Sequence, residues 1–333
     1  MTPRAIFLNR RDRLRSGWRF AVFVAVYYTV LTAAFVLLDG LLHLIARLTH
    51  GGDPEAGLSG VWGYLLQAAV LFGTALVVGW ACGRWLDGVP LRALGWARHR
   101  GWARDFLTGS LFGVLSLALA AALATLCGGF RFQLAPAGFG VAFVKTFFGA
   151  AGLYVLLAAA EEVLFRGYPL QTLLRAQPFV LAMIPSSLFF AYVHLNNPHV
   201  VPGFTFINTT LAGVWLATGF LRTRSLWFPL GLHWAWNWTM GSLLGLPVSG
   251  ITSLTHAPLL RAADHGPALL TGGSYGIEGG AACTVALIVS TLFIWRTGWL
   301  KANEELRPYT DGERPRETTG AIDETLTAIS GHG

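Results

Sequence analysis

Eight long stretches of this chain are almost free of charge, and they constrain its fold more than any other feature of the sequence. They cover residues 20–38, 61–83, 106–127, 141–160, 179–194, 204–221, 226–246 and 279–295, with Lys145 as their one Lys, Arg, Asp or Glu. A helix that crosses a bilayer needs roughly 20 apolar residues, and a charge at membrane depth is costly. The sequence therefore predicts an all-α fold, a polytopic transmembrane helix bundle with about eight spans.

Composition and charge exclude the common soluble classes of protein. Hydrophobic residues make up 54% of the chain and charged residues 12%, whereas roughly a quarter of the residues in a soluble domain are charged. The formal net charge of +7 comes from arginines that gather near the ends of the apolar stretches. Such charges orient a protein in the membrane, so we expect a lipid bilayer, and no nucleic acid, among its partners.

The loops between the apolar stretches alternate between many and few arginines. The rich segments are 4–19, 84–104, 166–175 and 222–224, and the poor loops hold only Arg47, Arg131 and Arg261. Loops rich in Lys and Arg stay on the cytoplasmic side. We therefore predict an integral protein of a bacterial-type inner or plasma membrane, with both termini in the cytoplasm.

The chain divides into three parts. Residues 1–105 contain two spans and an amphipathic segment, 90–104, that we expect at the membrane interface. Residues 106–300 contain the other spans, and no internal repeat supports a transporter built from inverted repeats. Residues 301–333 are polar and carry seven of the 17 acidic residues of the chain. We expect this C-terminal tail to be disordered and cytoplasmic.

Two adjacent glutamates, Glu161 and Glu162, follow the fourth apolar stretch. On a helix, Glu162 can pair with Arg166 four residues later, whereas Glu161 points about 100° away and lacks that partner. The two glutamates are either charges at a cytoplasmic helix end or functional groups that face a cavity. Their spacing leaves both alternatives open.

Other polar side chains interrupt the apolar stretches. His194 closes the fifth stretch four residues after Phe190, and His233 and Asn237 share one helix face in the seventh. If they are structural, they are an interfacial histidine and hydrogen-bonding groups between helices. If they are functional, they face a polar site. Asn208 belongs to the same set, and we expect a structural role for it.

Together, these groups have the chemistry that a hydrolase needs. A carboxylate and a histidine can activate water by general-base catalysis. A histidine and an asparagine can donate hydrogen bonds to a developing oxyanion. Hydrolysis of an acyl bond would use Glu161, His194, His233 and Asn237 together.

The order of the motifs resembles that of a known family, the CAAX-protease and bacteriocin-processing (CPBP, or Abi) intramembrane proteases, which include the Ras-converting prenyl-protein endopeptidase. The family's patterns are E-E-x-x-x-R, then F-x-x-x-H, then H-x-x-x-N. The matching residues, in the same order, are Glu161, Glu162 and Arg166, then Phe190 and His194, then His233 and Asn237. The likeness covers about residues 141–246.

The resemblance implies an intramembrane endopeptidase that hydrolyses a peptide bond of a membrane-associated protein or peptide, for example a prenylated CAAX chain. It implies Glu161 as the general base on water, with help from His194, and His233 with Asn237 as the oxyanion hole. The implied supporting residues are Glu162, Arg166, Phe190 and Asn208.

We favour a reaction without a cofactor. The sequence lacks the H-E-x-x-H pattern, and Glu161, His194 and His233 lie on three segments without a short-spaced chelating pair. Zinc is the alternative cofactor, and these three residues would then be its ligands.

Two functions of other classes stay open. In a carrier or proton-relay membrane protein, Glu161, His194 and His233 would pass protons or bind a cation. A non-catalytic immunity or scaffold protein would keep the motifs without turnover. A protease would lose its function with Glu161, whereas a scaffold would tolerate that loss.

A protease mechanism also requires that Glu161 and His194 lie close together in the fold. Glu161 closes a span that runs towards the cytoplasm, and His194 closes the next span, which runs outward, yet the two must meet. We therefore expect the helix of Glu161 to continue towards Gly167, and the span of His194 to be short or tilted.

Overall fold

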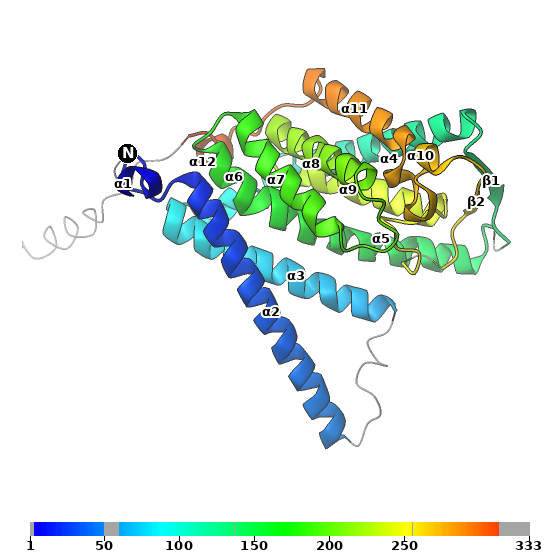
Figure 1. Cartoon of the computed structure of the whole chain (residues 1–333), viewed down its shortest axis with the longest axis horizontal. Helices are drawn as coiled ribbons and strands as arrows, with labels where there is room; N and C mark the ends of the chain where they lie inside the picture. Colours follow the sequence, from blue (N-terminus) through cyan, green and yellow to red (C-terminus); the bar gives the residue numbers. More distant parts are fainter. Residues whose placement is uncertain (1–2, 50–59, 137, 255, 313–333) are drawn as a thin grey trace, which may run out of the picture.

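The computed structural model describes residues 3–49, 60–136, 138–254 and 256–312, and it is predominantly helical (Figure 1). Each of the eight apolar stretches forms a helix. These helices are α2 (Ser16–Leu48), α3 (Val61–Cys82), α4 (Trp102–Leu126), α5 (Val141–Glu162), α7 (Phe179–His194), α8 (Phe204–Thr223), α9 (Trp227–Trp238) and α11 (Ala281–Arg296). Among the described residues, five helical segments are long and apolar enough to cross a membrane, and α7 and α11 are shorter apolar helices. The predicted all-α transmembrane fold is confirmed.

Shorter elements join these helices. The short helices and 3-10 turns are α1 (Pro3–Phe7), η3 (Leu91–Leu94), α6 (Tyr168–Leu174), α10 (Ala268–Thr271), η6 (Gly273–Tyr275), η7 (Ile277–Gly279) and α12 (Arg307–Thr310). The π-helical turns η2 (Gly83–Asp87), η4 (Val163–Gly167) and η5 (Thr239–Leu243) directly continue α3, α5 and α9. The segment 90–104, which we expected at the membrane interface, contains the 3-10 turn η3. Ala93 and Leu94 of this turn are buried in the protein.

One small sheet adds to the helical fold. Strand β1 (Phe130–Leu134) pairs antiparallel with β2 (Leu260–Asp264), and Phe130 lies opposite Asp264. The sheet connects the loop after α4 to the loop after η5. Its strands have five residues each and pair across more than a hundred residues of sequence, so no local pattern predicted them.

The helix that carries the two glutamates continues past them. α5, η4 and α6 form one uninterrupted helical segment, Val141–Leu174, of 34 residues. The π turn begins directly after Glu162, and all of its residues are buried. π turns inside α-helices occur frequently at functional sites. The expected continuation towards Gly167 is therefore present, and it moves Glu161 away from the helix end.

Helices α4 and α9 approach each other closely because glycines line their contact. A Cβ atom at Gly109 would lie 2.1 Å from the Phe228 carbonyl oxygen, and one at Gly113 would lie 2.3 Å from that of Leu232. From the other side, a Cβ atom at Gly231 would lie 2.1 Å from the Phe106 carbonyl oxygen. Small residues allow such backbone contact between membrane helices. This contact fixes the position of α9.

Helices α2 and α3 diverge from each other (Figure 1). The buried residues of α2, namely Ser16, Arg19, Phe23 and Tyr27, all lie in its first half. The second half exposes many large apolar side chains, among them Leu37 and Leu41. Apolar exposure of this extent fits a helix surface that faces lipid.

A buried ion-pair cluster ties the start of α2 to α6. The Arg19 Nη1 atom lies 2.6 Å from Asp87 Oδ1, and both side chains are almost fully buried. Thr172 donates a hydrogen bond to Asp87 Oδ2, and the Arg175 guanidinium lies 3.5 Å from the same oxygen. A buried charge is tolerated when it is paired in this way.

The first residues of the predicted disordered tail are packed. Leu306 and Thr310 are buried, and the Tyr309 carbonyl oxygen accepts a hydrogen bond from Arg175 Nε at 2.8 Å. Asn303 N–H also donates to the Thr223 carbonyl oxygen at 2.8 Å. These first residues dock onto the helices, because a few apolar side chains in a polar segment suffice for docking. The rest of the predicted tail, 313–333, lies outside the described residues.

Candidate active site

Three of the predicted site residues meet in space. The Glu161 Oε2 atom lies 3.7 Å from His194 Nε2 and 3.7 Å from His233 Nε2. The three side chains come from α5, α7 and α9. A separation of 3.7 Å is too long for a direct hydrogen bond, and it suits contacts that a water molecule bridges.

Helix lengths explain how Glu161 and His194 reach the same depth. Glu161 lies thirteen residues before the end of α6, and His194 lies fifteen residues after the start of α7. With a rise of about 1.5 Å per residue, both residues are about 20 Å from the loop that joins α6 to α7. The span of His194 is short, as expected, with 16 residues.

Glu162 is the centre of a buried polar network. Its Oε1 atom accepts a hydrogen bond from Arg166 Nη1 at 3.2 Å and lies 2.9 Å from His233 Nδ1. The Arg166 guanidinium also donates to the Gly213 carbonyl oxygen and lies 4.4 Å from the centre of the Phe190 ring. The Glu162 and Arg166 side chains are 0% and 1% exposed. The network thus holds His233 in a fixed orientation.

A backbone contact orients His194. Its Nδ1 atom lies 2.7 Å from the Phe190 carbonyl oxygen, and its ring packs on the Phe190 ring with centroids 4.4 Å apart. A carbonyl oxygen can only accept, so Nδ1 carries the proton. In the neutral ring, Nε2 then has a free lone pair on the side of Glu161. This nitrogen can accept a hydrogen bond from water.

Asn237 and Asn208 differ in how their amides are used. Asn237 lies one helical turn after His233, and no hydrogen bond joins its side chain to another described residue. The Asn208 amide donates to the carbonyl oxygens of Glu278 and Gly280, and its oxygen accepts from Thr284. Asn208 is therefore engaged in holding a turn, whereas Asn237 can bind another molecule.

A large cavity adjoins Glu161. It has a volume of about 280 Å³ and is lined by α2, α3, α5, α7, α9 and the loop 248–254. Its wall includes Glu161, His194, His233 and Asn237, together with apolar side chains and tyrosines. The Glu161 side chain is 30% exposed. The cavity is large enough for part of a peptide chain to reach the carboxylate.

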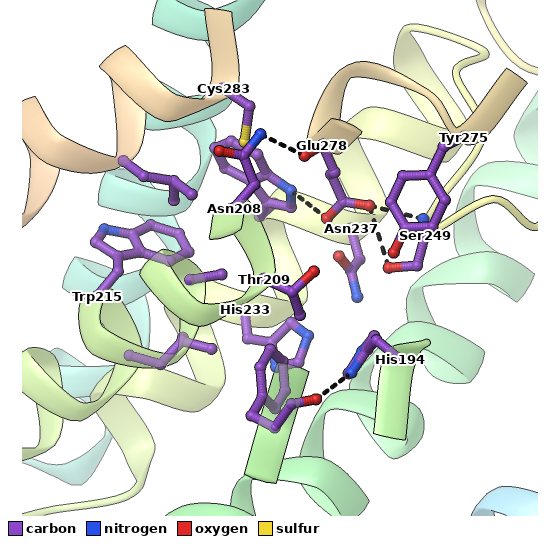
Figure 2. A pocket seen from close by; sticks show the side chains of 15 residues that line it. His194, Asn208, Thr209, Trp215, His233, Asn237, Ser249, Tyr275, Glu278 and Cys283 are labelled. Atoms are coloured by element: carbon purple, nitrogen blue, oxygen red, sulfur yellow. Dashed lines mark hydrogen bonds between the residues drawn. The ribbon is translucent and has the colours of Figure 1, made fainter. Parts of the chain in front are cut away.

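A small chamber, shown in Figure 2, shares part of its wall with the large cavity. It has a volume of about 40 Å³, and His194, His233, Asn237 and Ser249 line both this chamber and the large cavity. Thr209, Tyr275 and Glu278 line the small chamber alone. The two histidines and Asn237 therefore form a partition between the two spaces.

Glu278 is a site residue that the sequence analysis missed. Its carboxylate accepts hydrogen bonds from Trp236 Nε1 at 3.0 Å and from the backbone and hydroxyl of Ser249 at 2.6 and 3.1 Å. Burial raises the pKa of Glu278, and these hydrogen bonds act in the opposite direction. The available signal in the sequence was an isolated acid just before an apolar stretch, in the glycine-rich run Gly276–Gly280.

The described residues contain no group of three or more His, Cys, Asp and Glu side chains with an arrangement that could hold a metal ion. Glu161 does lie near His194 and His233, with 3.7 Å between its Oε2 atom and each Nε2 atom. Each histidine has its Nδ1 atom engaged, one with a carbonyl oxygen and the other with Glu162. The Nε2 atoms are the ones that face Glu161.

The region around these residues resembles a known protein family. Residues 143–239 match the family model described as type II CAAX prenyl endopeptidase, Rce1-like. The matched segment includes the two glutamates, both histidines and Asn237. No curated protein and no solved structure matches the chain. The family match confirms the resemblance that the motifs indicate, and it covers the region that carries the candidate site.

Proposed function

We propose that this integral membrane protein is a glutamate-dependent intramembrane endopeptidase that hydrolyses a peptide bond of a membrane-associated substrate. One observation carries the proposal: Glu161 faces a cavity and lies 3.7 Å from the Nε2 atoms of both His194 and His233. The family match supports a CAAX-type protease in general.

Glu161 is the general base. Its Oε2 atom is buried and has no hydrogen-bond partner among the described residues. A water molecule between this oxygen and His194 Nε2 would donate one hydrogen to each. Glu161 then takes a proton as the water oxygen attacks the carbonyl carbon. A positioned base of this kind accelerates hydrolysis about 10²- to 10⁴-fold.

Asn237 and His233 stabilise the oxyanion. The Asn237 amide always carries hydrogens that it can donate to the oxyanion. His233 uses Nδ1 for Glu162, so it can donate from Nε2 only when both ring nitrogens carry a proton. Charge balance favours that state: with His233 protonated, Glu161 and Glu162 give two negative charges, and Arg166 and His233 give two positive charges. An uncompensated charge in a low-dielectric site is strongly unfavourable.

The leaving group completes the reaction. When the tetrahedral intermediate collapses, the carbon–nitrogen bond breaks and the proton on Glu161 passes to the leaving amine. One water molecule is consumed, a carboxylic acid and an amine are formed, and Glu161 is again a carboxylate. Each residue therefore returns to its starting state.

We propose a membrane-anchored protein or peptide, with a prenylated CAAX chain as the first candidate, as the substrate. The large cavity adjoins the diverging helices α2 and α3, whose apolar side chains give a lipid-attached chain a path from the bilayer. For the orientation we propose cytoplasmic termini, because the arginines gather in the segments on that side.

Terminal profiling of membrane proteins tests the proposal. Membranes from cells with the wild type and with Glu161→Gln are compared for peptide termini that depend on the protein. A fluorogenic farnesylated CAAX peptide, incubated with the purified protein, tests the first candidate. We expect termini that disappear in the variant. Identical termini in both samples, together with a Glu161-dependent proton or cation flux in vesicles, would replace the protease with a carrier.

A further inference from the structure

The two spaces beside the catalytic residues differ in size and in chemistry. The large cavity of about 280 Å³ has room for a substrate segment, whereas the small chamber has about 40 Å³. A water molecule needs roughly 10–15 Å³ of such a volume and two to four polar partners. The small chamber is thus sized for about three water molecules and is too small for most side chains of a substrate.

The chamber wall supplies the polar partners. The Asn237 amide, the Tyr275 hydroxyl and the Glu278 carboxylate line it, together with His194 and His233 (Figure 2). Glu278 is held in place by its bonds to Trp236 and Ser249. A fixed carboxylate with fixed neighbours provides hydrogen-bond acceptors whose positions do not depend on substrate binding.

Hydrolysis in a filled cavity requires a separate supply of water. A substrate in the large cavity covers Glu161 from the side of α2 and α3, and each cleaved bond consumes one water molecule. We propose that the small chamber is a water-binding site that delivers the hydrolytic water to Glu161 past His194 and Asn237. This inference rests on the proposed function, because it assigns a source to the water of that reaction.

A matched pair of threonine variants tests the chamber. Thr209 is buried and lines the chamber, whereas Thr210 does not; both hydroxyls donate to the carbonyl oxygen four residues earlier at 2.8 Å. Thr209→Leu fills the chamber, and Thr210→Leu removes the same kind of bond elsewhere. With a fluorogenic farnesylated CAAX peptide, we expect Thr209→Leu to lower kcat at least tenfold with KM changed less than twofold. Thr210→Leu should change both less than twofold.

A second measurement needs no substrate. Hydroxyl radicals generated from bound water by an X-ray pulse label side chains beside that water. Trp236, Tyr275 and Cys283 line the chamber and are at most 3% exposed, and Phe228, which is 0% exposed, does not line it. We expect labelling of the three chamber residues well above that of Phe228, and loss of this excess in Thr209→Leu. Ala212→Val, another chamber-filling change, replaces Thr209→Leu if that variant does not fold.

The outcomes separate the inference from the proposed function. Labelling of the chamber residues no stronger than that of Phe228 overturns the water site, whatever the activity. If the wild type cleaves the peptide and Thr209→Leu cleaves it equally fast, the water site is also overturned. The proposal of a protease then still stands. A higher KM with unchanged kcat would make the chamber a substrate subsite. A wild type without cleavage in both the peptide and terminal assays overturns the protease, and the labelling result still decides the chamber.

Discussion

The Oε1 atom of Glu162 lies 2.9 Å from Nδ1 of His233, so the second glutamate of the pair holds the histidine that the first glutamate faces. One imidazole ring thereby connects two adjacent carboxylates with different surroundings. Glu161 is 30% exposed and faces the large cavity, and Glu162 is fully buried. The two positions should therefore respond differently to the same substitution.

Glu161→Gln should abolish turnover and leave the fold intact. The amide keeps the shape of the side chain but cannot take a proton from water, so we expect the cleavage rate to fall about 10³-fold. The melting temperature in detergent should change by only a few degrees. The measurement is the rate of cleavage of the substrate peptide beside a thermal melt. Cleavage near the wild-type rate would show that another group is the base.

Glu162→Gln should lower both stability and rate. The change leaves Arg166 without its buried carboxylate, and loss of one partner of a buried pair costs about 3 kcal/mol in the free energy of unfolding. It also removes one negative charge that stabilises protonated His233, so kcat should fall. Chemical unfolding in detergent and kcat on the same preparation check this. If Glu162→Gln has the stability of Glu161→Gln, the network around Glu162 contributes no stability.

Much of the fold could be predicted from the sequence because membrane helices are local. A run of about 20 apolar residues has to be helical in a bilayer, since its backbone groups have no other partners. Each of the eight apolar stretches is therefore a helix. The continuation of the helix past Glu161 towards Gly167 was also predicted, because Glu161 and His194 had to reach the same depth, whereas its π-helical form and its extension through α6 were not.

The missed features depend on contacts between distant segments. The pairing of Glu162 with His233 joins residues 71 positions apart, and the spacing of Glu162 suggested only Arg166. Glu278 joins the site through hydrogen bonds to Trp236 and Ser249. Local periodicity contains no information about such partners. The motif order indicated which groups act together, and it did not reveal which of them touch.

Gly113→Ala should impair activity without a contact to substrate. The new Cβ atom would lie 2.3 Å from the Leu232 carbonyl oxygen, so α9 must move away, and α9 carries His233 and Asn237. Overpacking of this kind costs about 1–3 kcal/mol. The control is Gly149→Ala in α5, where an added Cβ has no neighbour within 4 Å. We expect a lower melting temperature and a lower kcat for Gly113→Ala alone; equal behaviour of the two variants would contradict the close contact of α4 and α9.

Exhaustive chelation should leave the cleavage rate unchanged. Glu161, His194 and His233 come from three helices without a short-spaced chelating pair, which tight zinc sites usually contain. The measurement is the cleavage rate before and after dialysis against a strong chelator, with metal analysis of both samples. Stoichiometric zinc that is lost together with activity, and restored with it, would make these three residues metal ligands.

Glu278→Gln should change how stability depends on pH. Burial raises the pKa of Glu278 above its ordinary value of 4.5, so the folded state binds its proton more tightly than the unfolded state does. A raised carboxyl pKa gives a contribution to stability that is complete below pH 4.5 and is lost as the pH rises through the folded value. Glutamine does not titrate, and its variant lacks this dependence.

The free energy of unfolding of the wild type, minus that of Glu278→Gln, should therefore fall as the pH rises from about 4.5, by at most about 1.4 kcal/mol per pH unit. Chemical unfolding of both proteins between pH 4 and 8 measures this difference, in which the titration of groups that do not interact with Glu278 cancels. The control is the same substitution at Glu304, whose side chain is 76% exposed. A difference that grows with pH would mean that the bonds from Trp236 and Ser249 outweigh burial. In that case the folded state would favour the Glu278 carboxylate over its protonated form, and the chamber would keep this charge to a lower pH than an exposed glutamate would.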